Sequence, residues 1–177
     1  MYSALILGAT SAIAEETTRK LATQGSQMVL VGRNTERLEA QAQDLKVRGA
    51  HAVHTIALDL NDFEAHLPTW NKALELLGEI DLVFVCHGIL GNQKEGETDF
   101  SHALLNLNTN FLSVVSFLTP VANYFENLKK GTIAVVSSVA GDRGRQSNYI
   151  YGTAKGAKTI YLQGLRNRLA KSGVQVL

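Results

Sequence analysis

The chain has 177 residues, of which 45% are hydrophobic, so it is long enough to bury a substantial core as one domain. Its formal net charge is +1 and the charged residues are scattered, which gives no reason to expect a nucleic-acid partner. The single cysteine, Cys86, excludes an internal disulfide. The N-terminus lacks a charged leader, and no stretch approaches the ~20 apolar residues of a spanning helix, so we expect a cytoplasmic protein that does not cross a membrane.

Apolar, strand-like runs alternate with helical patterns along the chain. In chain order the expected strands are 3–7, 27–31, 51–57, 80–86 and 132–137, and the expected helices are 12–24, 34–48, 61–77, 101–127 and 150–171. The polar, glycine-rich segment 88–99 is expected to form a mobile loop. This alternation predicts an α/β fold of a single domain, residues 1–177, in which helices cover both faces of a doubly wound parallel sheet in three layers, α/β/α. Ligands then bind at the carboxyl ends of the strands.

The first expected strand leads into a turn of small residues and then into a helix. The turn begins at Gly8 and continues through Thr10, Ser11, Ala12 and Ile13. Glycine at its first position permits backbone dihedrals that are closed to other residues. A strand, a tight turn and a helix N-terminus form an anion site, because unpaired amide groups and the helix dipole point at the ligand. The segment therefore indicates a site for the phosphates of a dinucleotide.

The second expected strand ends in Gly32 and Arg33 instead of an acidic residue. In dinucleotide folds an acid near this place binds the adenosine ribose, whereas an arginine can hold the 2′-phosphate of NADP. The guanidinium is a bidentate donor for phosphate. We therefore favour NADP over NAD, with NAD as a possible cofactor. The alternative is that Arg33 is a solvated residue at the end of the strand.

A tyrosine and a lysine stand four residues apart near the C-terminal end, thirteen residues after Ser138. Residues i and i+4 share a helix face, so Tyr151 and Lys155 can approach each other while a serine at a strand end meets them. A nearby cation favours the ionised form of a phenol. Tyr149 and Tyr161 have no lysine at this spacing. The alternative is an ordinary amphipathic helix, on which such a pair is common.

Together these features resemble the classical short-chain dehydrogenase/reductase family over essentially the whole chain. Its motifs appear here in order as the glycine turn, Asp59 after the third strand, Cys86-His-Gly88 after the fourth, Asn110, Ser138, Tyr151 and Lys155. The resemblance implies a Rossmann-type fold and a nicotinamide cofactor. It implies cofactor contacts from Gly8, Thr10, Ser11, Ala12, Ile13, Arg33, Asp59, Leu60, His87, Gly88, Tyr151 and Lys155.

The resemblance also implies the roles of four catalytic residues. Tyr151 exchanges a proton with the substrate oxygen, and Ser138 holds and polarises that oxygen. Lys155 lowers the pKa of the phenol and binds the nicotinamide ribose. Asn110 fixes a water that relays protons to the lysine. The family pattern around this asparagine matches Asn110-Phe-Leu-Ser113, so we expect the neighbouring asparagines 106 and 108 to face elsewhere on the same helix.

The chain departs from the family pattern in three places. Ala12 and Ala14 stand where the family usually has glycines, and Val85-Cys-His-Gly88 stands where it typically has Asn-Asn-Ala-Gly, so that an asparagine is missing. His87 either replaces that asparagine, contacts the adenosine half of the cofactor, or makes a structural hydrogen bond. We expect no metal there, because the other histidines show no paired ligand spacing. Cys86 is expected to be a small buried apolar residue and not a nucleophile.

The third departure is at the end of the chain. Residues 173–177 look like the entry into a sixth strand, and family members continue with a substrate-binding loop and a last strand. We therefore expect a C-terminally truncated version of a longer protein that lacks the last strands.

The expected function is that of an NADP-dependent oxidoreductase that transfers hydride between a nicotinamide cofactor and a ketone or secondary alcohol, with Tyr151 as acid and base. The alternative is a catalytically inactive dinucleotide-binding regulatory protein, since a fold does not determine a function. The partner is a small-molecule carbonyl or alcohol substrate. The family also implies a homodimer or homotetramer formed through helices 101–127 and 150–171.

Overall fold

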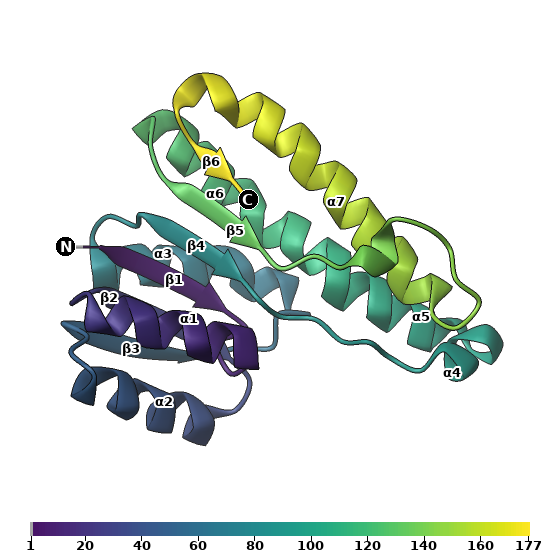
Figure 1. Cartoon of the computed structure of the whole chain (residues 1–177), viewed down its shortest axis with the longest axis horizontal. Coiled ribbons are helices and arrows are strands. Elements are labelled where there is room, and N and C mark those ends of the chain that lie inside the picture. The colour runs from purple at the N-terminus through teal and green to yellow at the C-terminus, as the bar shows by residue number, and fades with distance from the viewer. Residues whose placement is uncertain (1) are drawn as a thin grey trace.

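The computed structural model describes residues 2–177 as six parallel strands in the order β3-β2-β1-β4-β5-β6 (Figure 1). The strands are β1 Ser3–Leu7, β2 Gln27–Gly32, β3 Ala52–Ala57, β4 Leu82–Val85, β5 Thr132–Val135 and β6 Gln175–Val176. The chain winds outward in one direction from β1 to β3 and in the other from β4 to β6. The predicted doubly wound, three-layer sheet is therefore confirmed, and its topological switch point lies between β1 and β4.

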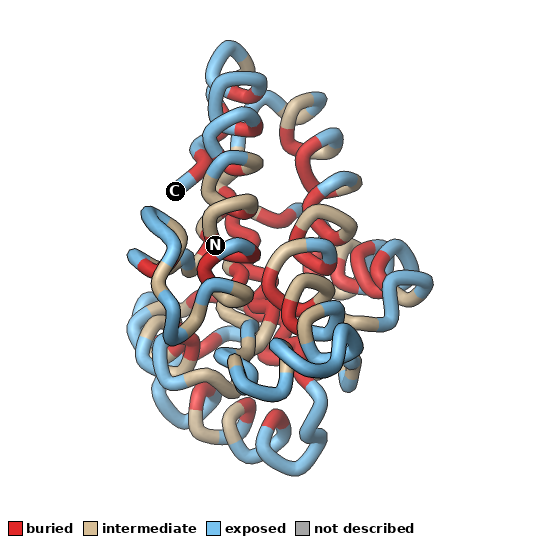
Figure 2. Tube along the Cα trace, turned by 90° about the vertical axis from the view of Figure 1, so that its right-hand side faces the viewer, coloured by how far each residue is buried: buried red, intermediate tan, exposed pale blue. Residues whose placement is uncertain are grey.

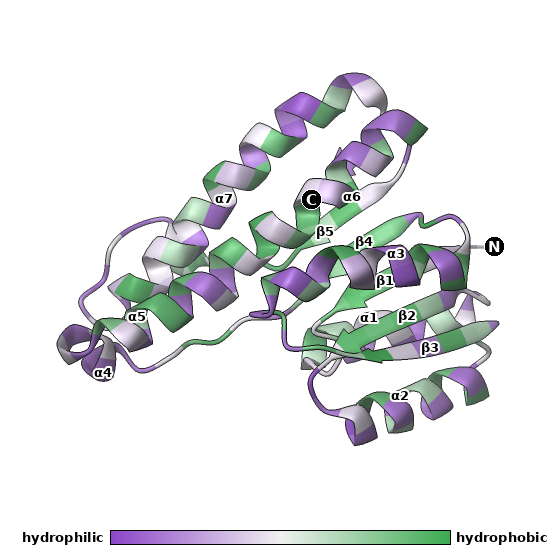
Figure 3. Ribbon diagram, turned by 180° about the vertical axis from the view of Figure 1, so that it is seen from behind, coloured by the Kyte–Doolittle hydropathy of each residue, from purple (hydrophilic) through white to green (hydrophobic). Residues whose placement is uncertain are grey.

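Seven α-helices connect the strands of the described chain. They are α1 Ala12–Thr23, α2 Thr35–Val47, α3 His66–Leu77, α4 Gln93–Thr98, α5 Phe100–Leu107, α6 Ser113–Leu128 and α7 Tyr149–Leu169. Short 3₁₀ turns cover Phe63–Ala65, Val139–Gly141 and Ala170–Ser172, and one π-helical turn covers Asn108–Leu112. Helices α1 and α2 lie on one face of the sheet, and α3, α6 and α7 lie on the other (Figures 1 and 3).

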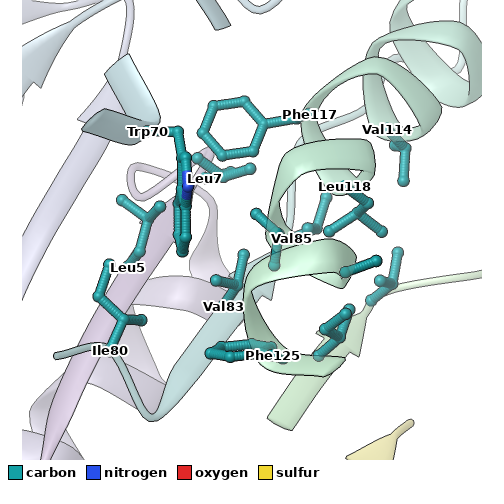
Figure 4. Packing of buried hydrophobic residues seen from close by; sticks show 14 of the residues in the cluster. Leu5, Leu7, Trp70, Ile80, Val83, Val85, Val114, Phe117, Leu118 and Phe125 are labelled. Carbon is teal, nitrogen blue, oxygen red and sulfur yellow. The ribbon is translucent and has the colours of Figure 1, made fainter. Parts of the chain in front are cut away.

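Two hydrophobic layers hold the helices to the sheet. Alternate residues of β1 point to opposite faces, so that Leu5 packs toward α3 and α6 while Ile6 packs toward α1 and α2. Both faces are covered, which explains why the strands are nearly continuous apolar runs. On the α6 side, Trp70 and Phe117 lie beside each other over the strand residues (Figure 4). The buried positions run through the centre of the molecule (Figure 2).

Three expected elements differ from the structure. The helix expected at 61–77 begins only at His66, after a 3₁₀ turn. The segment 88–99, expected to be a loop, contains α4, whose N-terminus is capped when the Asn92 side chain accepts hydrogen bonds from the amides of Lys94 and Glu95. The helix expected at 101–127 is divided by the π-helical turn Asn108–Leu112. Such turns insert one residue into a helix and are common at functional sites.

The helical run Phe100–Leu128 is long and apolar enough to cross a membrane by length and composition alone. This differs from the expectation that no stretch approaches that length. In the structure its residues Val114, Phe117 and Val121 are fully buried in the layer between α6 and the sheet. A core helix of this kind has the same composition as a spanning helix, so composition alone does not separate the two.

The sixth strand is short but paired. Gln175 and Val176 lie beside Thr132 and Ile133 of β5 in parallel register. The amide of Leu177 then donates to the carbonyl of Ile133 at 2.8 Å. Residues 173–177 therefore contain the sixth strand whose entry they were expected to form.

Candidate active site

The glycine turn brings the end of β1 against the end of β4. Gly8 has a φ of +75°, and a Cβ at this position would lie 2.6 Å from the backbone nitrogen of His87. Only glycine avoids both the strained backbone conformation and the collision with His87, because it has no Cβ. The side chain of Ser11 caps α1 by accepting from the amide of Ala14 at 3.2 Å. The first-turn amides of Ala12 and Ile13 have no acceptor within the helix, and they provide the donors of an anion site.

A cleft of about 270 Å³ opens at this edge of the sheet, at the topological switch point. We call it the first cleft. The predicted cofactor residues Gly8, Thr10, Ser11, Arg33, Asp59, Leu60, His87 and Gly88 all line it. Residues that were not predicted line it as well: Gly32, Leu58, Asn61, Cys86, Ile89, Leu105 and Thr109. Most of these are sequence neighbours of the predicted residues at the strand ends, which was the signal that could have identified them.

Two arginines flank the first cleft in different ways. Arg33 is exposed at the end of β2 and lines the cleft. Arg37, on α2, was not predicted; its Nη2 donates to the carbonyl of Thr10 and to Glu15 Oε1, both at 3.1 Å. Arg37 therefore ties α2 to the glycine turn, whereas Arg33 forms no ion pair or hydrogen bond with the described residues and is free to meet an anionic ligand.

His87 makes a structural hydrogen bond, one of the alternatives expected for it. Its Nε2 lies 2.8 Å from Ser113 Oγ, and that hydroxyl donates to the carbonyl of Thr109. Nε2 therefore carries the proton, and the buried Nδ1 has no partner among the described residues. Burial, followed by the nearby Lys158 and Lys155 charges, lowers the pKa of His87 to about 3. The ring is neutral at physiological pH and ties the end of β4 to α6.

Cys86 is half-buried beside the glycine turn. Burial raises the pKa of its thiol to about 12, against the smaller opposing effects of Ser11 and Lys158. A thiol with this pKa has almost no thiolate at neutral pH, and the thiolate is the nucleophile. The prediction that Cys86 is not a nucleophile is consistent with this environment.

Asn110 lies in the π-helical turn and is fully buried. Its Nδ2 donates to the carbonyl of Ile89 at 2.7 Å, and its Oδ1 accepts from the amide of the same residue at 3.2 Å. Nδ2 also lies 2.9 Å from Asn106 Oδ1, while Asn106 Nδ2 donates to the carbonyl of Leu90 at 2.9 Å. The expectation that Asn106 faces elsewhere is wrong, because residues four apart share a helix face. The two asparagines together fix the backbone of residues 89–90.

Tyr151 and Lys155 approach each other on α7, as their spacing predicts. The Lys155 Nζ lies 5.4 Å from the centroid of the Tyr151 ring. Lys155 is buried, with 4% of its surface exposed, whereas Tyr151 is half-buried and reaches the surface of a cleft. The Lys155 cation therefore lies over the face of the Tyr151 ring. Lys155 Nζ also stands 3.3 Å from the point that a Cβ on Gly88 would occupy, so the cation borders the rim of the first cleft.

Ser138 follows β5, and the turn behind it packs closely against α7. Its Oγ accepts from the amide of Ala140 at 3.2 Å, which leaves its O–H free to donate. A Cβ on Gly152 would lie 2.6 Å from the carbonyl oxygen of Ala140, so the glycine beside Tyr151 permits this approach. The Oγ of the neighbouring Ser137 is instead hydrogen-bonded to Thr159 Oγ1 at 3.0 Å. Ser138 is therefore the serine whose hydroxyl is available as a donor. It does not line the first cleft, nor the second cleft that is described next.

A second cleft of about 270 Å³ lies beside Tyr151. Its lining residues come from the segment after β4, from α5 and from the start of α7: Leu90, Gly91, Asn92, Gln93, His102, Asn106, Ser147, Asn148, Ile150 and Tyr151. The segment 87–93 borders both clefts, since His87 to Ile89 line the first and Leu90 to Gln93 the second. The asparagines that fix this segment therefore hold the wall between them.

Six predicted residues do not line the first cleft, and Ser138 is one of them. Ala12 and Ile13 belong to the first turn of α1 and contribute backbone amides only. Asn110 and Lys155 are buried behind Gly88, and Tyr151 lines the second cleft. Within residues 2–177, no three His, Cys, Asp or Glu side chains gather in a way that could hold a metal ion.

Comparison with known proteins identifies the family of this chain. Residues 3–177 match the short chain dehydrogenase family. An uncharacterized oxidoreductase of Mycobacterium tuberculosis is 39% identical over 173 residues, which cover 98% of this chain and 69% of that protein. One from Streptomyces coelicolor is 34% identical over 176 residues, covering 99% of this chain and 69% of the relative.

Two solved structures share the fold. A xylitol dehydrogenase bound to NAD⁺ superposes with a TM-score of 0.89 at 24% identity, covering 98% of this chain and 66% of that one. A metagenomic short-chain oxidoreductase in complex with NADP gives a TM-score of 0.91 at 22% identity, covering 99% and 79%. The chain thus spans about two thirds to four fifths of the proteins it resembles. On the family match over nearly its whole length, the chain belongs to the short-chain dehydrogenase/reductase family, whose members are nicotinamide-dependent oxidoreductases.

Proposed function

We propose that the protein is an NADP-dependent oxidoreductase that interconverts a ketone and a secondary alcohol, with Tyr151 as the acid and base. The observation that carries this proposal is the position of the Tyr151–Lys155 pair. The lysine borders the rim of the first cleft and the tyrosine lines the second. A cofactor in the first cleft and a substrate in the second react at this junction, where the proton donor and the cation both lie.

The residues of the first cleft fit a dinucleotide. The turn at Gly8 and the free amides of α1 suit the pyrophosphate, and Asp59 and Leu60 border the expected adenosine end. The free, exposed Arg33 supports a 2′-phosphate ligand, because a guanidinium binds phosphate with two parallel hydrogen bonds. No acidic residue stands at the end of β2 to bind an unmodified ribose. These features favour NADP, with NAD as the second choice.

The chain's own groups supply proton transfer and polarisation. When bound, the nicotinamide supplies or accepts the hydride. In the direction of reduction, the Tyr151 hydroxyl gives its proton to the substrate oxygen as hydride reaches the carbon, so the carbonyl becomes an alcohol. Lys155 stabilises the negative charge left on the phenol oxygen. The Ser138 hydroxyl donates to the same substrate oxygen, and such preorganised donors typically contribute a few kcal/mol to transition-state stabilisation.

The second cleft supports a neutral substrate that carries hydroxyl groups. Amide side chains of Asn92, Gln93 and Asn148 line it together with the hydroxyl of Ser147. Among its described lining residues there is no lysine or arginine, and the histidine, His102, already lies beside the carboxylates of Glu95 and Asp99, so the cleft offers no unpaired cation for a phosphate or carboxylate. Amides both donate and accept hydrogen bonds, as hydroxyl groups require. A polyol or a sugar carbon fits this lining better than an anionic or a purely apolar substrate.

The first test is a titration of the full-length protein with NADPH and, separately, NADH, followed by nicotinamide fluorescence. We expect saturable binding that is tighter for NADPH, and then turnover in a screen of carbonyl compounds. Tighter binding of NADH would contradict the cofactor preference but not the enzyme. Binding without turnover across neutral, hydroxylated ketones and their alcohols would favour the regulatory alternative, and no binding of either nucleotide would refute the proposal.

We also propose that the protein is a homo-oligomer. In the run predicted to form the contact, Val114, Leu118 and Val121 are buried against the sheet and are not available. Other apolar side chains on α5 and α7 remain exposed: Phe100, Leu104, Tyr149 and Ile160. An exposed apolar surface of this kind supports association. Gel filtration should give a dimer or tetramer, and a monomer at micromolar concentration would contradict the proposal.

A further inference from the structure

A second lysine follows Lys155 by one turn on α7. Lys158 has none of its surface exposed to solvent and is among the largest fully buried side chains of the described chain. Positions 151, 155 and 158 follow each other at spacings of four and three, so Tyr151, Lys155 and Lys158 share one face of the helix. The mechanism proposed above uses the first two and leaves the third without a role. Lysine is almost never fully buried unless it is paired.

The surroundings of Lys158 hold little that would stabilise a charge. Its Nζ donates to the backbone carbonyl of Val136, just after β5, at 2.8 Å. The titratable groups that face it are Lys155 on its own helix and Cys86 and His87 after β4. Neither lysine forms an ion pair with a carboxylate within the described residues. An ammonium here would have three donors, one protein acceptor and a second cation beside it.

The physical consequence is a neutral amine. Burial, and then the charge of Lys155, lower the pKa of Lys158 to about 6. The lowered pKa favours the uncharged amine of Lys158, which has a lone pair. Lys155 stands three residues earlier on the same face of α7 and is buried with Lys158, so its ammonium is the neighbouring donor available to the Lys158 nitrogen.

This arrangement costs stability. An apolar side chain of similar volume would fill the same space without desolvating an amine. Features that destabilise a fold and break the usual pattern of burial gather at functional sites. The position directly behind the lysine of the active site agrees with such a role.

We propose that Lys158 is a positioning residue: its neutral amine accepts a hydrogen bond from Lys155 and holds that ammonium beside Tyr151 and the first cleft. Protonation of Lys158 in mildly acidic solution removes the acceptor, places two cations side by side and weakens cofactor binding. The inference rests on the proposed function and on the family resemblance, which implies that Lys155 binds the nicotinamide ribose. No residue other than Lys158 changes its charge in this step.

Two variants separate the positioning role from simple packing. Lys158→Gln keeps an acceptor oxygen and a donor group but does not titrate, whereas Lys158→Met fills the space with neither. In the full-length protein with ¹³C-labelled lysine, we expect one Cε resonance to titrate near pH 6 and to be absent from both variants. The second readout is the NADPH dissociation constant between pH 5.5 and 7.5. If NADPH binds only to the protein with neutral Lys158, the dissociation constant of the wild type is about fourfold higher at pH 5.5 than at pH 7.5.

The 2′-phosphate of NADPH also titrates, but its effect on the dissociation constant is the same for all three proteins. Comparing the variants with the wild type therefore cancels it. Lys158→Gln should bind like the wild type at pH 7.5 and lose the additional fourfold acid effect. Lys158→Met should bind several-fold more weakly at pH 7.5, although its melting temperature should rise because the buried amine is gone. The control Lys171→Met changes an exposed lysine and should alter neither readout.

The proposal is overturned if no lysine resonance titrates below pH 8, if Lys158→Gln keeps the full acid effect, or if Lys158→Met binds NADPH as tightly as the wild type. If the variants do not fold, the wild-type resonance and the wild-type pH dependence decide by themselves. Absence of NADPH binding at every pH would instead refute the proposed function, while the lysine resonance would still report the ionisation.

Discussion

Replacing Gly8 by alanine tests the close approach that forms the first cleft, and Gly25 provides a matched control. Both glycines have a left-handed backbone, with φ of +75° at Gly8 and +71° at Gly25. They differ in their surroundings. A Cβ on Gly8 would lie between 2.6 and 2.8 Å from three atoms of His87, whereas a Cβ on Gly25 would have nothing within 4 Å.

The magnitudes follow from these contacts. A Cβ in the left-handed region costs about 1–2 kcal/mol, and this term applies equally to both positions. At Gly25 this backbone cost is the only destabilising contribution of the substitution. It is reduced by about 0.4–1 kcal/mol, because alanine restricts the unfolded chain. At Gly8 the turn and the end of β4 must also move apart, because carbon atoms in contact stand about 3.5–4.0 Å apart. Overpacking of this kind costs about 1–3 kcal/mol more.

The assay is urea unfolding followed by the fluorescence of Trp70, the only tryptophan of the chain, which is 3% exposed. We expect Gly8→Ala to lower the free energy of unfolding by about 2 kcal/mol more than Gly25→Ala does. Gly8→Ala should also weaken NADPH binding, whereas Gly25→Ala, at the opposite end of α1, should not. Equal destabilisation by the two substitutions would refute the reasoning, because it would show that the contact with His87 carries no energy.

Three further predictions concern the site. Tyr151→Phe should lower kcat by about 10²–10⁴-fold with little change in NADPH affinity, while the control Tyr149→Phe should be active; a Tyr151→Phe protein with full turnover would contradict the assignment. Arg33→Ala should raise the dissociation constant of NADPH more than that of NADH. Equal effects on the two constants would show that Arg33 is a solvated surface residue that does not bind the 2′-phosphate. Stability should fall as the pH drops from about 6.5 toward 3, because the unfolded His87 binds a proton in this window and the folded ring, with its pKa of about 3, does not. The slope from this group is at most about 1.4 kcal/mol per pH unit, so urea unfolding at pH 7 and pH 5 should show a smaller loss in His87→Asn than in the wild type.

The order of elements was predictable because it depends on local periodicity. Each strand in the structure lies within one residue of an expected strand or inside it, since buried parallel strands are short apolar runs. The boundaries were less predictable. Helix α4 was missed because its sequence is polar and contains Gly96, and the cap from Asn92 that starts it is a side-chain contact.

The candidate site was predictable where it depended on spacing. Tyr151 and Lys155 follow helical geometry, and Gly8 follows from the turn that the fold needs. Asn106 was misplaced because the family pattern singles out Asn110 and says nothing of its neighbour at i−4, which helical geometry puts on the same face. Lys158 stands with Lys155 on a helix face whose other buried positions are apolar or glycine, and a second lysine in such a stripe was the signal in the sequence.

The sequence by itself determined the parallel α/β architecture, the glycine turn and the helical pairing of a tyrosine with a lysine. All of these can be predicted from patterns among residues near each other in the chain. Only the tertiary structure decided the partners of His87, the two asparagines that hold the wall between the clefts, and the burial of Lys158 against Val136. The physical reason is that a side chain's charge state and hydrogen bonds depend on which distant segments exclude water from it, and local periodicity carries no information about that.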